Sequence, residues 1–142
     1  MDAATKTPAL ATTAQTLLRV VIGFLFAAHG WQKYFQFTLD GTTAAFGQMG
    51  VPAAGLVAPV VATLEIAGGI ALVLGVLTRL FAVLLTVNML GALVLVHAPA
   101  GVFVEAGGFE LVLALAAGAA AIALLGPGRL SVDRFIPVRI AA

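Results

Sequence analysis

Hydrophobic residues fill four long stretches of this chain, and polar residues mark the ends of those stretches. Each stretch is close to the roughly 20 residues that an α-helix needs to cross about 30 Å of hydrocarbon. None shows the strict alternation of apolar and polar positions that is typical of a membrane-spanning β-strand. The pattern therefore predicts helices over residues of about 16–35, 56–77, 80–97 and 109–126.

Composition places these helices in a membrane. Only 9% of the 142 residues are charged and 62% are hydrophobic, and the mean hydropathy is +1.15. A soluble domain has about a quarter of its residues charged, and a helix satisfies its own backbone hydrogen bonds in lipid. We therefore predict an all-α fold, an integral membrane four-helix bundle that forms a single domain over residues 1–142.

Three segments outside the helices carry their own predictions. Residues 41–50 combine hydroxyl side chains that cap helices with apolar contacts, so a short interfacial segment is expected on the outer surface. Residues 126–128, Gly-Pro-Gly, end the last helix. The basic tail over 129–142 is expected on the cytoplasmic leaflet, where Asp133 would pair with a neighbouring arginine. Residues 1–12 are expected to form a loosely ordered lead-in.

Basic residues are distributed unequally between the two sides of the predicted bundle. With a cytoplasmic N-terminus, six of them fall on the cytoplasmic side and one on the other. Cytoplasmic loops of membrane proteins carry an excess of lysine and arginine, so both termini are predicted to be cytoplasmic. The net charge of +1 gives no indication of a nucleic-acid partner, and because no basic patch exists beyond the sparse tail we expect none. The six cytoplasmic residues are Lys6, Arg19, Arg79, Arg129, Arg134 and Arg139, and the seventh is Lys33.

Polar side chains from all four helices gather in the outer half of the predicted bundle. On the first helix, His29, Gln32 and Lys33 stand at positions i, i+3 and i+4 and therefore share one face. On the second helix, Glu65 lies about nine residues in, which at 1.5 Å per residue is roughly 13 Å deep. The convergent set is His29, Gln32, Lys33, Glu65, His97 and Glu110.

A carboxylate at this depth costs several kcal/mol unless it is paired, protonated or hydrated, so Glu65 needs a partner such as Lys33 or a histidine. Two interpretations stay open: a polar network that fixes helix register, and a small-ligand site with polar groups in an apolar surround. Asn88 is expected to donate a hydrogen bond to another helix. The histidines and acids lack the HxxxH or ExxH spacing of a metal site.

A series of short motifs follows one another along nearly the whole chain. They are Arg19, Ala28-His29-Gly30-Trp31-Gln32-Lys33, Gly50-Val51-Pro52, Glu65 with Gly68-Gly69, Leu77-Thr78-Arg79, His97, Gly108-Phe109-Glu110 and Gly126-Pro127-Gly128-Arg129-Leu130-Ser131-Val132-Asp133. With these motifs the chain resembles the DoxX family over roughly residues 15–135. The resemblance implies a small prokaryotic four-helix protein of the cytoplasmic (inner) membrane. Family members are associated with membrane redox functions, including quinone-linked sulfur oxidation and resistance to quinones and oxidative stress.

The residues and the resemblance together favour a redox-linked subunit, an oxidoreductase component whose pocket binds a quinone or similar apolar carbonyl compound. In this interpretation a histidine bonds a ligand oxygen, a carboxylate handles its proton, and Phe26, Leu64 and Leu93 supply the walls. No intrinsic cofactor is expected, and no catalytic residue is assigned. The alternatives are a scaffold that anchors soluble redox enzymes at the cytoplasmic side and a small proton-coupled transporter. A homo-oligomer is compatible with each.

Overall fold

The computed structural model describes the backbone of residues 3–136 and the side chains of residues 9–136. This part of the chain contains helices and no strand, which confirms the all-α prediction. Two π-helical segments, Gln32–Gln36 and Leu93–His97, extend α1 and α4, and three short 3-10 helices span Ala98–Ala100, Val104–Ala106 and Val132–Phe135. The α-helices are α1 (Ala3–Trp31), α2 (Leu39–Gln48), α3 (Ala54–Leu74), α4 (Thr78–Ala92) and α5 (Glu110–Leu125).

Helix α1 begins earlier than the apolar pattern indicates. The prediction of a loosely ordered lead-in is wrong for residues 3–12, because α1 already starts at Ala3. The segment is rich in alanine, the strongest helix former, and therefore continues the apolar helix towards the N-terminus. Of the predicted basic tail, residues 129–136 are described, and 137–142 lie outside the described residues.

Three stretches of the described chain are long and apolar enough to cross a membrane: Ala9–Gln36, Ala54–Leu74 and Thr78–Ala100. Helix α5 is apolar but has only 16 residues, or about 24 Å of helix at 1.5 Å per residue. That is less than the roughly 30 Å of an average hydrocarbon core. The membrane-spanning character of the fold thus rests on α1, α3 and α4, with α5 packed against α4.

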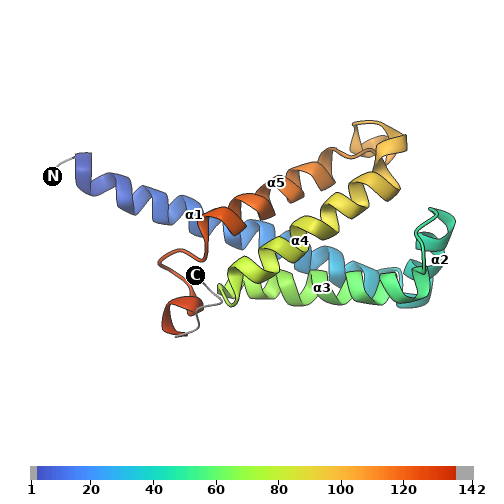
Figure 1. Cartoon of the computed structure of the whole chain (residues 1–142), viewed down its shortest axis with the longest axis horizontal. Helices are drawn as coiled ribbons and strands as arrows, with labels where there is room; N and C mark the ends of the chain where they lie inside the picture. Colours follow the sequence, from blue (N-terminus) through green and yellow to red (C-terminus); the bar gives the residue numbers. More distant parts are fainter. Residues whose placement is uncertain (1–2, 137–142) are drawn as a thin grey trace.

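The long helices form two layers (Figure 1). Helix α1 packs on α3 and α4 packs on α5, while contacts of α3 with α4 and of α1 with α5 join the layers. The layers diverge towards the end that carries α2 and residues 98–109, here called the loop end (Figure 1). The shared core consists of Ile22, Phe26, Leu72, Ala82, Leu85, Met89, Val112, Leu115, Ala116, Ala119 and Ile122.

Glycines bring the backbones of α1 and α3 into close contact. A Cβ atom added at Gly69 would lie 2.4 Å from the backbone nitrogen of Ala27, and one added at Gly30 would lie 2.7 Å from that of Ile66. Such distances leave no room for any side chain at these two positions. Small residues allow this approach, which in lipid supplies the packing and polar contacts that hold helices together. The polar face of α1 is thereby held directly against α3.

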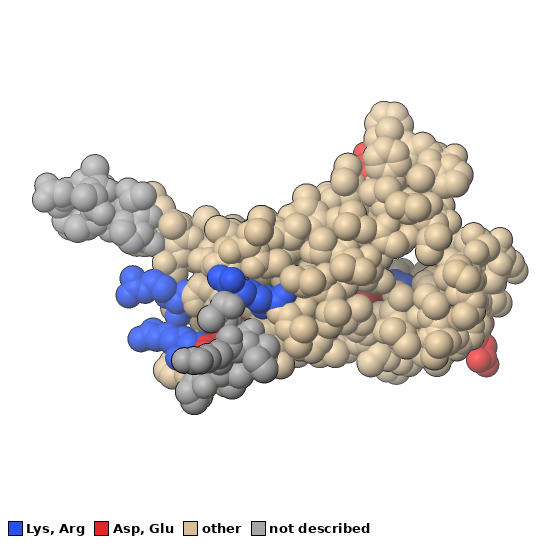
Figure 2. All heavy atoms as spheres, in the orientation of Figure 1, with Lys and Arg blue, Asp and Glu red and all other residues tan. Residues whose placement is uncertain are grey.

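Lysine and arginine side chains gather at the opposite end, here called the basic end (Figure 2). Arg19 is only 2% exposed; its Nη1 donates to the Leu72 carbonyl at 3.1 Å and its Nη2 donates to the Leu130 carbonyl. Asp133 does not pair with a neighbouring arginine as predicted. Its carboxylate accepts the backbone N–H groups of Leu77 at 2.6 Å and Thr78 at 2.9 Å, which caps the start of α4.

Candidate functional site

A cavity of about 430 Å³ lies between the two layers at the loop end, where the surface is hollowed (Figure 2). Its floor is the top of the hydrophobic core, formed by Phe26, Met89, Val112 and Leu115. Its sides come from α1, α3, α4 and α5, with α2 and residues 98–109 at the rim. The cavity therefore exists because the layers are packed tightly at the basic end and diverge beyond the core.

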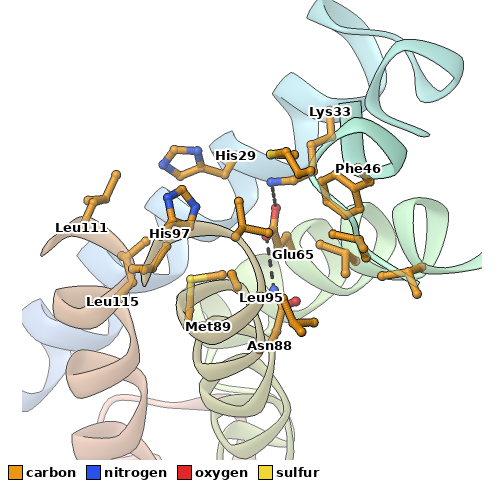
Figure 3. A pocket seen from close by; sticks show the side chains of 18 of the residues that line it. His29, Lys33, Phe46, Glu65, Asn88, Met89, Leu95, His97, Leu111 and Leu115 are labelled. Atoms are coloured by element: carbon orange, nitrogen blue, oxygen red, sulfur yellow. Dashed lines mark hydrogen bonds and ion pairs between the residues drawn. The ribbon is translucent and has the colours of Figure 1, made fainter. Parts of the chain in front are cut away.

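Five of the six predicted site residues line this cavity (Figure 3). The predicted common face of the first helix is confirmed, because His29, Gln32 and Lys33 all reach the cavity. Glu65 faces it from α3, and His97 faces it from the end of the helical stretch that continues α4. Residues far apart in the sequence thus form one polar group in a mainly aliphatic and aromatic wall.

Lys33 and Glu65 form an ion pair at the polar side of the cavity (Figure 3). The distance from Lys33 Nζ to Glu65 Oε2 is 2.6 Å, and the Glu65 side chain is only 3% exposed. Asn88 Nδ2 donates to the other carboxylate oxygen at 3.2 Å, which confirms the predicted cross-helix bond. Each oxygen of the buried acid therefore accepts a hydrogen bond, as the high cost of an unpaired carboxylate at this depth requires.

The π-helical segments that continue α1 and α4 both carry site residues. In the first, Phe37 N–H donates to the Gln32 carbonyl at 3.0 Å, a bond across five residues that widens the turn containing Lys33. Thr42 on α2 donates its hydroxyl to the Lys33 carbonyl at 2.9 Å, which satisfies a backbone acceptor in this turn. Such turns are rare and are frequent at functional sites. No residue pattern marks them in the sequence, so they were not predicted.

The histidines differ in how the protein uses their nitrogens. His97 Nδ1 lies 2.7 Å from the carbonyl oxygen of Gly107 in the loop before α5. His29 and Gln32 line the cavity and make no side-chain hydrogen bond with any residue that the structure describes. The cavity thus contains the Lys33–Glu65 ion pair and His97, which bonds to the protein through one ring nitrogen. His29 and Gln32 add polar groups that are free to bind a ligand.

Three predicted members of the site lie elsewhere. Glu110 does not line the cavity; its Oε1 accepts the Val104 N–H at 2.8 Å, and it tethers the preceding loop. Leu64 and Leu93 do not line the cavity and instead pack against the hydrophobic core. Phe26 is part of both the core and the cavity floor. Over the described residues, no three histidine or acidic side chains converge as metal ligands would.

These features define a class: an α-helical protein with several membrane-spanning helices and a small cavity beside a buried ion pair. The chain belongs to the DoxX family, whose model matches residues 14–98. The matched region starts within α1 and reaches the end of the helical stretch that continues α4. It therefore includes all five residues of the polar group in the cavity.

Curated relatives cover most of the chain. A Bacillus subtilis protein with the name "Putative oxidoreductase CatD" is 33% identical over 84% of this chain and 84% of its own length. The uncharacterised membrane protein Rv3486 of Mycobacterium tuberculosis is 33% identical over 88% of this chain and 82% of its own. The inner membrane protein YqjF of Escherichia coli is 33% identical over 83% of this chain and 88% of its own length. No solved structure matches. The protein is a multi-pass inner membrane protein.

Proposed function

We propose that this protein is a redox-associated membrane subunit whose cavity binds a quinone or a similar small apolar carbonyl compound. One observation carries the proposal: His29 and Gln32 present unused hydrogen-bonding groups inside an apolar cavity of about 430 Å³. Cavities of roughly 300–1,000 Å³ with apolar walls and a few polar groups are typical small-molecule sites. The name of the relative CatD supports a redox role.

The polar groups suit an uncharged ligand with oxygen acceptors. The Gln32 amide and an imidazole nitrogen of His29 donate hydrogen bonds, and Lys33 has three N–H bonds of which Glu65 accepts one. Because Glu65 neutralises Lys33, the cavity offers no net positive charge to an anion. An aromatic ring would rest on the apolar floor, while its carbonyl oxygens accept from these side chains.

The rim of the cavity suits a ligand that arrives from the bilayer. Phe37, Met49 and Leu95 line the cavity, yet 55%, 43% and 52% of their surfaces are exposed. Exposed apolar side chains beside an opening are compatible with hydrocarbon and costly in water. An apolar compound dissolved in the membrane therefore reaches the cavity without crossing a polar barrier.

The test is a quinone titration of the purified protein in nanodiscs. Trp31 is the only tryptophan, so saturable quenching of its fluorescence by 2-methyl-1,4-naphthoquinone reports binding two residues from His29. Replacing His29 and Gln32 together by leucine removes two hydrogen bonds of about 1 kcal/mol each, so the Kd should rise roughly tenfold or more. Asp40→Asn, an exposed change on α2, is the control and should leave the Kd unchanged. An unaltered Kd in the double variant would exclude this cavity as the site.

We also propose that both termini are cytoplasmic. The described arginines of the predicted cytoplasmic set lie at the basic end, whereas Lys33 lies at the loop end. Alkaline phosphatase fused after Asp40 should therefore be active, and the same reporter at Ala142 should be inactive. An active C-terminal fusion would reverse the orientation and place the cavity in the cytoplasmic half.

A further inference from the structure

A hydrogen bond to the loop before α5 determines which ring nitrogen of neutral His97 carries the hydrogen. Its Nδ1 lies 2.7 Å from the Gly107 carbonyl oxygen. A carbonyl oxygen only accepts hydrogen bonds, so Nδ1 must carry the hydrogen and donate it. In the neutral ring, Nε2 then bears a lone pair and is an acceptor. No described residue donates to Nε2, and the ring lines the cavity (Figure 3).

We infer that His97 Nε2 accepts a hydrogen bond from a ligand hydroxyl, so that the preferred occupant is a hydroxylated aromatic ring such as the quinol form. This inference rests on the proposed function, because it specifies which ligand the same cavity takes. A quinone oxygen has lone pairs only, and placed against Nε2 it would leave two acceptors facing each other. A hydroxyl supplies the missing hydrogen, and no covalent bond changes in the process.

Glu65, Gln32 and His29 do not impose this preference. Each oxygen of Glu65 already accepts a hydrogen bond, one from Lys33 and the other from Asn88. The free amide of Gln32 turns to offer either its oxygen or its nitrogen, and His29, without a hydrogen bond to the protein, adopts either tautomer. Each therefore accommodates a carbonyl and a hydroxyl alike. Of the two histidines in the cavity, His97 is the one whose tautomer is fixed by a hydrogen bond to the protein. Histidines at binding sites often have their tautomer fixed in this way, through the nitrogen that faces away from the ligand.

Two substitutions separate the two roles of His97, the acceptor at Nε2 and the hydrogen bond from Nδ1 to Gly107. In His97→Asn, the amide nitrogen stands near the place of Nδ1 and keeps a donor for Gly107, while nothing occupies the place of Nε2. In His97→Gln, the longer side chain brings an amide oxygen near the place of Nε2 and gives up the bond to Gly107. Alanine would remove both functions at once and is not informative.

The probes are 1-naphthol and its methyl ether 1-methoxynaphthalene, which share the ring but differ in the ability to donate. Titrations use protein in nanodiscs, with partition measured in empty nanodiscs. The native protein should bind the naphthol about five-fold more tightly, the effect of one ordinary hydrogen bond. His97→Asn should bind the two probes equally, and His97→Gln should retain the preference. Hydrogen exchange in residues 101–109 should rise in His97→Gln and stay unchanged in His97→Asn.

The outcomes distinguish this inference from the function on which it rests. Equal affinities in the native protein, with quinone binding intact, would overturn the role of His97 and leave the proposed function standing. A preference that persists in His97→Asn would likewise overturn it. If neither naphthalene probe nor the quinone binds saturably, both proposals fail together.

Discussion

Replacing Glu65 with alanine is expected to lower the free energy of unfolding by about 3 to 5 kcal/mol, the usual cost of removing one partner from a buried ion pair. The Lys33 ammonium, 2.6 Å from the carboxylate, would lose its partner beside an apolar cavity, and Asn88 would lose its acceptor. Unfolding by denaturant in detergent micelles, followed by circular dichroism, measures the change. Glu110→Ala should cost less, because that carboxylate bonds one backbone N–H of an exposed loop.

The matched control removes both charges. In the double variant Lys33→Met with Glu65→Leu, no charge is left unpaired, so the protein should be more stable than with Glu65→Ala alone. Removal of the pair by apolar side chains is often close to neutral, although Asn88 still lacks its acceptor. If Glu65→Ala and Glu110→Ala unfold alike, the ion pair is solvated and the interpretation as a buried network is wrong. If the double variant is the least stable of all, Glu65→Ala does not leave a costly unpaired charge on Lys33.

The polar residues around Glu65 could largely be predicted from the sequence, because their placement follows from the geometry of a single helix and from the cost of burying a charge. Helical spacing alone puts His29, Gln32 and Lys33 on one face. A carboxylate within an apolar helix requires a partner, and Lys33 on the preceding helix was, with the two histidines, among its nearest plausible cations. The same reasoning predicted that Asn88 would bond across to another helix, as it does with Glu65. These predictions need only the helix repeat and the depth of each residue.

The failures have a common physical cause in the loops and turns. Glu110 stands at the same depth as His97, but the preceding loop folds so that Val104 N–H reaches its carboxylate. Asp133 has arginines beside it in sequence, yet the chain returns to the start of α4, where two unsatisfied N–H groups bind it more favourably. Neither the path of an irregular segment nor a π-helical turn follows from hydropathy. The hydrogen bonds of Glu110 and Asp133 therefore depend on tertiary contacts, which the sequence pattern does not reveal.

The geometry of the cavity depends on how closely α1 and α3 approach, and Gly69 controls that distance. Gly69→Ala is expected to lower the free energy of unfolding by about 3 kcal/mol, because overpacking costs roughly 1 to 3 kcal/mol and here the neighbour is rigid backbone. The added Cβ would lie 2.4 Å from the nitrogen of Ala27 and 2.5 Å from the carbonyl oxygen of Gly23. Neither can rotate away as a side chain could, so α1 must shift.

The same shift should weaken ligand binding, since His29, Gln32 and Lys33 move with α1 while Glu65 stays on α3. Gly55→Ala is the matched control in the same helix, because a Cβ there meets no atom within 4 Å. It should leave quinone affinity unchanged and stabilise the helix by up to about 1 kcal/mol. Denaturant unfolding and the Trp31 titration, applied to both variants, measure the two effects. Equal stability and equal affinity in the two variants would mean that α1 and α3 are not in backbone contact, and that the ion pair tolerates a wider separation of its helices.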